Sequence, residues 1–161
     1  MQRFYSNEEW LIDGEDGWQE FSGVREIIGE FDCIKVIVNN GYWIKGTPEH
    51  VVYIEYDKEI ELRELKVGMR IKTLYGYEEV VGIEVSREEV VYDVVGTRLG
   101  RYVTNGVVTK NCDEFAHVPN GQCVMGDEVV EVRYGDEVKE VTLEKLYNVM
   151  EVVNGSGKVC E

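Results

Sequence analysis

The sequence predicts a single domain of the all-β class. Short runs rich in Val, Ile, Tyr and Trp recur about every ten residues and are separated by Gly, Asn and Asp, which is typical of strands joined by turns. Asn40-Gly41 between two apolar runs predicts a type I′ hairpin, and Gly135-Asp136 predicts a second tight turn. With 161 residues and 43% hydrophobic side chains, the chain can bury a core without disulfides.

The expected strands follow one another along the chain, with a looser turn at 13–17. We place them at 9–12, 18–21, 31–38, 42–45, 51–56, 70–75, 79–85, 90–95, 101–104, 107–109, 128–134 and 137–141. Residues 60–69 and 141–150 resemble each other in outline, and their apolar spacings of two, three and four predict one short helical turn each. Residues 154–158, Asn-Gly-Ser-Gly-Lys, predict a frayed end.

The acidic composition limits the partners of the domain. With 17 basic and 32 acidic side chains, the formal net charge is −15. Nucleic acids and anionic membranes would be repelled, because binding to them needs clustered Lys and Arg. No apolar run approaches the ~18 residues of a membrane helix, and no signal-peptide pattern is present. We therefore expect a cytoplasmic monomer that binds neither nucleic acid nor membrane.

The four cysteines, Cys33, Cys112, Cys123 and Cys160, include no Cys-x-x-Cys pair. They are too sparse for a disulfide framework, and a zinc site is not expected. Cys33 lies within a predicted strand, which indicates a buried structural thiol. Cys160 is near the tail and has no expected role beyond a trapping disulfide.

Cys123 and the Thr-Pro-Glu-His run at 47–50 are candidates for chemistry. Cys123 opens a strand pattern and is either an accessible nucleophile or a buried small hydrophobe. Thr47 and His50 stand at the mouth of a strand, and Pro48 fixes the turn between them. His50 is then either a general acid–base that Thr47 assists or a strand-end histidine with a satisfied hydrogen bond.

These residues combine with a third group. Cys123, the 47–50 motif and the Asn-Cys pair at 111–112 together resemble the splicing blocks of an intein, which has the Hint fold of hedgehog autoprocessing domains. The Val-Tyr-Asp-Val run at 91–94 resembles the penultimate splicing block, and Leu-Lys-Val-Gly at 65–68 resembles a recurrent turn of this fold. The resemblance covers nearly the whole chain. It implies a horseshoe-like β fold with pseudo-twofold symmetry and one or two short helices.

The order of the blocks is rearranged. In an intein the cysteine comes first and the asparagine last, whereas here Asn111 precedes Cys123. The resemblance then implies a C-terminal intein piece at 1–111, an extein at 112–122 and an N-terminal intein piece at 123–161. The two pieces together form one Hint domain, and we expect their outer ends to lie close to each other.

The lengths of the two pieces and the extein also resemble a particular group. The short N-terminal piece is similar to that of atypically split inteins in phage terminase genes, and residues 113–120 resemble the Walker B region of a terminase large subunit. The rearranged order fits an engineered fusion.

The resemblance implies a mechanism. The Cys123 thiol would attack the carbonyl of Gln122 and form a thioester, while His50 protonates the departing amine and Thr47 bonds the carbonyl side. Cys112 would then take over the acyl group as a thiolate.

Finally, Asn111 would cyclise, release Cys112 and leave the 112–122 segment as a head-to-tail ring. The partner is thus the chain's own extein, and no metal, nucleotide or redox cofactor is expected.

Three residues depart from the family pattern. Lys110 stands where the family usually has His; it could stabilise an oxyanion by charge but shuttles protons poorly. The usual Asp-His pair of the penultimate block is missing near 98–101, and Glu128 stands near a common Thr. The first two departures predict a C-terminal step that is either slow or strictly dependent on the earlier steps.

Two alternatives differ in class. One is an ATPase fragment, with Asp113-Glu114 as a Walker B pair and 155–158 as a phosphate loop, although the loop lacks the flanking residues of that motif. The other is a non-catalytic all-β binding module whose motifs are accidental. It predicts that Cys123→Ala leaves the mass of the chain unchanged.

Overall fold

The computed structural model describes residues 2–6, 10–111, 123–154 and 157–160 and confirms the all-β class, with a single α-helix in the described part. The elements are β1 (Gln2–Ser6), β2 (Trp10–Gly14), β3 (Gly17–Gln19), β4 (Gly23–Val38), β5 (Trp43–Gly46), β6 (Val51–Ile54), β7 (Lys58–Glu61), β8 (Arg70–Thr73), β9 (Gly76–Val95), β10 (Arg101–Thr104), β11 (Val107–Lys110), β12 (Val129–Tyr134), β13 (Glu137–Thr142), α1 (Leu143–Asn154) and β14 (Gly157–Cys160).

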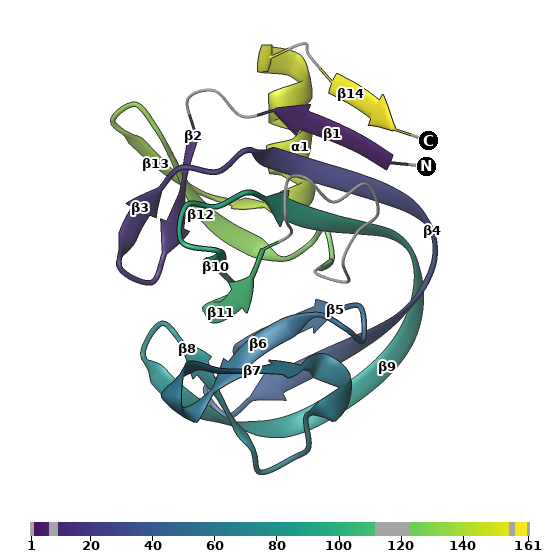
Figure 1. Ribbon diagram of the computed structural model, residues 1–161, viewed down its shortest axis with the longest axis vertical. Coiled ribbons are helices and arrows are strands. Elements are labelled where there is room, and N and C mark those ends of the chain that lie inside the picture. Colours follow the sequence, from purple (N-terminus) through teal and green to yellow (C-terminus); the bar gives the residue numbers. More distant parts are fainter. Residues whose placement is uncertain (1, 7–9, 112–122, 155–156, 161) are drawn as a thin grey trace.

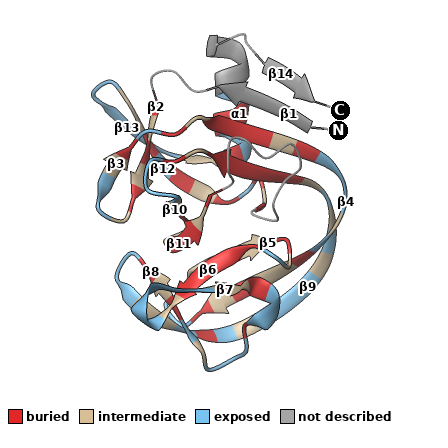
Figure 2. Ribbon diagram, in the orientation of Figure 1, coloured by how far each residue is buried: buried red, intermediate tan, exposed pale blue. Residues whose placement is uncertain are grey.

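Two long strands form the frame of the molecule. β4 and β9 pair antiparallel from Gly23↔Val95 to Val38↔Val80, with register shifts at two places. The curved ribbon that they form joins an upper lobe, with β2, β3, β12, β13 and α1, to a lower lobe with β5 to β8 (Figure 1). The pair is exposed where it bends; β4 is buried toward both lobes, whereas β9 is buried mainly at its upper end, over 91–95, as Figure 2 shows. This arrangement is the expected horseshoe.

The lobes are built on two sheets. The larger has the strand order β14-β1-β4-β9-β8-β11-β6-β7, with β10 beside β11 and β5 beside β4. The smaller has the order β13-β12-β2-β3. Aliphatic side chains from both lobes, among them Ile12, Ile44 and Leu146, are buried in one core. The candidate residues therefore lie on strands that the core holds in place.

The tight turns are where the sequence predicts them, but one differs in type. Asn40 does not have the positive φ that a type I′ turn requires; instead Gly41 N–H bonds to Val38 O at 3.0 Å and Gly41 has φ +90°. This is a three-residue loop closed by glycine. The two-residue turn at Gly135-Asp136 is confirmed, with Tyr134 opposite Glu137.

Both predicted helical turns are present, but they differ in length. Residues 60–69 hold only a 3-10 turn at Leu62–Glu64, whereas 141–150 leads into α1. The 3-10 turn ends at Leu65, whose backbone is extended. At its start, Leu62 N–H bonds to His50 O at 2.8 Å, and Arg63 N–H bonds to Pro48 O at 3.1 Å. These donors, which the first turn of any helix leaves without an intrahelical partner, therefore hold the 47–50 turn.

The chain ends also differ from expectation in one respect. Gly157–Cys160 is strand β14 rather than a frayed tail, and it pairs with β1 in the register Gln2↔Cys160. The expected proximity of the two ends is thus confirmed. A phosphate loop at 155–158 is not supported, because that motif places its lysine at the start of a helix. No described helix is long and apolar enough to cross a membrane.

Candidate functional site

Residues 123–125 are inserted between β5 and β9. Val124 exchanges two backbone hydrogen bonds with Tyr92, both 2.7 Å long, on the β9 side. On the β5 side, the carbonyl of Cys123 accepts the N–H of Thr47 at 3.0 Å, and Met125 N–H bonds to Lys45 O at 3.2 Å. Because both edges of this short segment are paired, the backbone of Cys123 is fixed in position.

Gly46 makes this close approach possible. A Cβ at position 46 would lie 2.5 Å from the carbonyl oxygen of Cys123 and 3.3 Å from Cβ and Cγ of His50. Carbon and oxygen atoms that are not bonded do not come this close, so any side chain here would push Cys123 away. The glycine that precedes the Thr-x-x-His motif is therefore needed for Cys123, Thr47 and His50 to meet.

The Cys123 thiol lies against a buried carboxylate. Its Sγ is 3.8 Å from Oδ2 of Asp93, which is fully buried. Nη1 of Arg25, also buried, lies 3.8 Å from the same oxygen. The carboxylate is therefore within hydrogen-bonding reach of the thiol, and the guanidinium group lies beside it. Sequence reasoning did not single out Asp93, although an acid within the apolar run 91–94 was a usable signal.

His50 is fully buried and bonded to a threonine on a different strand. Its Nε2 and the Thr109 hydroxyl form a short hydrogen bond. Since that hydroxyl donates to Val51 O at 3.1 Å, its oxygen accepts from the imidazole. We assign the proton of neutral His50 to Nε2 on this network, which leaves Nδ1 as the basic nitrogen. Thr109 was missed because the pairing of β6 with β11 is not visible in the sequence.

Thr47 contributes through its backbone. Its N–H bonds to Cys123 O, and its carbonyl accepts the N–H of His50 at 3.0 Å. The residue is 6% exposed. The structure thus brings Thr47, His50 and Cys123 together, as the sequence predicted.

Asn111 and Lys110 point to different surroundings. Asn111 is buried; its N–H bonds to Gly100 O at 3.2 Å and its Oδ1 accepts the Thr97 hydroxyl at 2.6 Å. The Lys110 ammonium pairs instead with Glu59 at 3.1 Å on the surface. Lys110 is the last residue of β11, and Asn111 follows the strand. The structure does not bring Lys110 to the amide of Asn111.

Cys112, Gln122 and the segment between them lie outside the described residues. What the structure describes are the two flanking positions, Asn111 and Cys123. His50 connects them. Its imidazole bonds to Thr109, two residues before Asn111, and its N–H bonds to the carbonyl of Thr47, whose own N–H bonds to Cys123 O.

Glu128 anchors the segment from its far end. Its carboxyl accepts Met125 N–H at 2.9 Å and the Thr104 hydroxyl at 3.4 Å, and the side chain is fully buried. Burial raises the pKa of Glu128 well above its usual range. A neutral acid at this position holds Met125, and through it Cys123, without burying an isolated charge.

Cys33 belongs to the same small apolar cluster as Cys123, together with Ile27 and Val91. Burial, with a smaller effect of Glu88, raises the pKa of the Cys33 thiol to about 11. A thiol with this pKa is protonated at neutral pH and a poor nucleophile. The prediction of a buried structural thiol is confirmed. Among the described residues, no group of three or more His, Cys, Asp or Glu side chains could hold a metal ion.

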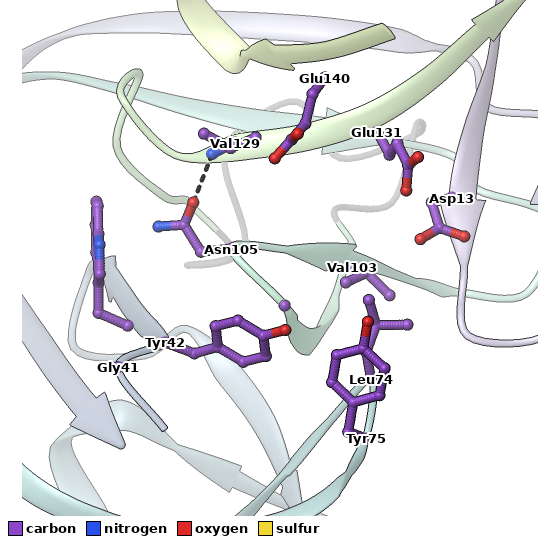
Figure 3. Close-up of a pocket in the computed structure, with 12 residues that line it drawn as sticks. Asp13, Gly41, Tyr42, Leu74, Tyr75, Val103, Asn105, Val129, Glu131 and Glu140 are labelled. Carbon is purple, nitrogen blue, oxygen red and sulfur yellow. Dashed lines mark hydrogen bonds between the residues drawn. The ribbon is translucent and has the colours of Figure 1, made fainter. Parts of the chain in front are cut away.

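A separate hollow of about 390 Å³ lies between the lobes (Figure 3). Asp13, Glu131 and Glu140 line one wall, and the stacked rings of Tyr42 and Tyr75 line the other. Burial, assisted by the charge of Glu131, raises the pKa of Asp13 to about 6. The lining contains no residue of the Cys123 site, so the hollow is distinct from it.

Comparison with known proteins gives structural matches only. No family profile and no curated protein sequence matches the chain. The crystal structure of the VidaL intein is 25% identical, with a TM-score of 0.55, over 63% of this chain and 69% of that one. A consensus engineered intein with an atypical split site is 24% identical, with a TM-score of 0.57, over 70% and 92%. The gp41-1 intein is 18% identical, with a TM-score of 0.56, over 68% and 94%.

The Gly46→Ala variant tests whether the position of Cys123 depends on the absence of a side chain at residue 46. In a background of Asn111→Ala and Cys112→Ala, which blocks acyl transfer and release of Cys112, we expect it to lower the free energy of unfolding by about 1–3 kcal/mol, because the added Cβ overpacks the strand contact. Alkylation of Cys123, mapped by mass spectrometry, should become faster. Gly82→Ala is the control, since its Cβ would meet only Ile37 at 3.6 Å. Equal effects of the two variants would contradict the assigned role of Gly46.

The Asp13→Asn variant tests the acidic wall. The folded pKa of Asp13 lies above its unfolded value, so its ionisation destabilises the fold as pH rises from about 4 to about 6. Removing that charge should raise the free energy of unfolding at pH 7.5 by about 1 kcal/mol, a value reduced for solvent screening, and should have little effect at pH 4. Urea unfolding at both values measures this. The exposed Asp16→Asn is the control, and a gain at pH 4 equal to that at pH 7.5 would contradict the prediction.

Proposed function

Because the chain has the fold of the inteins, a Hint domain, we propose that it is a self-processing protein-splicing domain that acts on its own segment 112–122. The observation that carries the proposal is the environment of the two residues that flank this segment. Cys123 is buried against Asp93 and close to His50, while Asn111 is buried two residues beyond the partner of His50. A nucleophile, a proton donor and a second nucleophile are thus available at the two ends of one segment.

In the first step, the Cys123 thiol gives its proton to the Asp93 carboxylate and the sulfur attacks the carbonyl carbon of Gln122. The carbon–nitrogen bond to Cys123 breaks and a thioester forms. The departing nitrogen takes a proton from Nδ1 of His50 in its imidazolium form, which Thr109 holds through Nε2. Arg25 keeps the carboxylate ionised before the step.

In the second step, the thiolate of Cys112 attacks the same carbonyl carbon and releases the thiol of Cys123. The side-chain nitrogen of Asn111 then attacks its own carbonyl carbon, and the bond to the nitrogen of Cys112 breaks. A succinimide remains on residue 111, and the freed amine of Cys112 displaces the sulfur to form a peptide bond. The product is a ring of residues 112–122.

We further propose the rearranged order, with 1–111 as the C-terminal piece and 123–161 as the N-terminal piece. The antiparallel pairing of β1 with β14 supports it, because it places the outer ends of the two pieces side by side, as a split opened within one domain would. The same proposal includes four further points. They are the likeness of 113–120 to a terminase, the origin of the chain as an engineered fusion, the monomeric state and the cytoplasmic location.

A time course of intact mass tests the function. Purified wild type kept with a reductant at neutral pH should lose its original mass over hours and give the ring together with the two flanking pieces. Cys123→Ala should form no ring, and Asn111→Ala should stop before release of Cys112. The buried, unreactive Cys33 makes Cys33→Ala the matched control for loss of a thiol, and this variant should still form the ring. A wild-type mass that stays constant would contradict the proposed function and favour a binding module.

A further inference from the structure

The last chemical step lacks the group that the sequence offered for it. Lys110 is paired with Glu59 on the surface and does not contact the Asn111 amide. The hydroxyl of Thr97 does contact it, with Oγ1 2.6 Å from Oδ1 of Asn111. Both residues are only 8% exposed. This contact is short enough for a strong hydrogen bond in a site that largely excludes water.

The turn that carries Thr97 is built around Asn111. Gly100 N–H bonds to Thr97 O at 3.2 Å, and Gly100 O accepts the N–H of Asn111 at the same distance. Gly100 has φ +80°, a conformation that favours glycine. The backbone and the side chain of Asn111 are therefore both held by one turn, 97–100.

The turn is itself fixed to the upper lobe. The amide of Gln19 on β3 donates to Arg101 O at 2.7 Å and accepts the N–H of Leu99 at 3.1 Å. Arg98 N–H bonds to Glu20 O at 3.0 Å. The hydroxyl of Thr97 thus reaches Asn111 from a rigid support, which is the condition for a group that orients a reacting amide.

We propose that Thr97 is a catalytic residue for the cyclisation of Asn111, an inference that rests on the proposed function. When Nδ2 attacks the carbonyl carbon of residue 111, it loses a proton, and the bond to the nitrogen of Cys112 breaks as that nitrogen takes a proton up. The negative charge that develops on the amide is shared with Oδ1. The Thr97 hydroxyl donates to that oxygen, so the bond strengthens as the charge grows.

The same bond orients the nucleophile. A side-chain amide can present either its oxygen or its nitrogen to a carbonyl, and only the nitrogen yields a succinimide. By holding Oδ1, Thr97 assigns Nδ2 to the opposite edge of the amide. The neutral hydrogen bond from Thr97 therefore performs part of the role in cyclisation that the penultimate histidine usually has in the family. Lys110, which stands at that penultimate position, pairs with Glu59 instead.

Thr97→Val and Thr97→Ser test the inference. In the otherwise wild-type chain, Thr97→Val should slow release of Cys112 by about 10- to 100-fold, as for loss of one donor to a developing anion, so that the branched thioester accumulates. Thioester formation at Gln122 should stay within about twofold of wild type, because Thr97 does not contact Cys123. Thr97→Ser retains the hydroxyl and should keep release within a few-fold.

A buried threonine elsewhere provides the matched control. Thr73 is 3% exposed and its hydroxyl donates to Gly76 O at 2.7 Å, so Thr73→Val removes an equivalent bond without touching Asn111. It should leave the ratio of the two steps unchanged. Release of Cys112 at the wild-type rate in Thr97→Val, or equal slowing by valine and serine, would overturn the inference.

A second background separates this inference from the proposed function. In Cys123→Ala no thioester can form, yet cleavage after Asn111 can still be followed by the mass of the succinimide. In that background, cleavage after Asn111 should be fastest with the native Thr97, slower in Thr97→Ser and slowest in Thr97→Val. If this order holds while the wild-type chain forms no thioester, the proposed splicing fails and the role of Thr97 stands. Absence of cleavage after Asn111 in both backgrounds would overturn the role of Thr97.

Discussion

The site depends on one constraint, the seating of residues 123–125 between β5 and β9. Backbone groups of β5, of β9 and of Thr47 just after β5 hold this segment by hydrogen bonds, and the close approach exists only because position 46 has no side chain. The long β4–β9 ribbon supports this arrangement, since it carries β5 on one partner and Asp93 on the other. The fold thus brings the thiol of Cys123, the carboxylate of Asp93 and the imidazole of His50 together from distant parts of the sequence.

The buried polar groups around residues 123–125 have distinct physical roles. The ion pair of Arg25 with Asp93 places a negative charge beside a thiol, where an isolated carboxylate would be too costly to bury. Glu128 avoids the cost of burying an isolated charge in a different way, because burial raises its pKa and favours the neutral carboxyl group. Cys33 lies in the same cluster as Cys123, but burial and the nearby charge of Glu88 raise the pKa of its thiol to about 11, so it keeps its proton at neutral pH. The proposed nucleophile differs in that the carboxylate of Asp93 lies 3.8 Å from its sulfur.

Much of this could be predicted from local sequence. Alternating β-branched runs gave most strands, and the turns at 40–41 and 135–136 gave the hairpins. The grouping of Cys123 with 47–50 came from motif resemblance. Thr97 and Thr109 could not be found in this way, because each acts through a strand pairing or turn that joins residues far apart in sequence. The contact of the 62–64 turn with the 47–50 turn, through the N–H groups of Leu62 and Arg63, is likewise not visible in the local sequence. Lys110 was assigned to the site from its position beside Asn111, although it pairs with Glu59 on the surface.

The central claim is that Cys123 forms a thioester with Gln122 in the folded chain. The most direct measurement treats the folded Cys112→Ala variant, which cannot pass the acyl group on, with hydroxylamine and locates the modified residue by tandem mass spectrometry. The account predicts a hydroxamate on the carboxyl end of Gln122, a new amino terminus at Cys123, and neither product when Cys123 is also replaced by alanine. A chain that remains uncleaved, or a hydroxamate at another residue, would contradict the account.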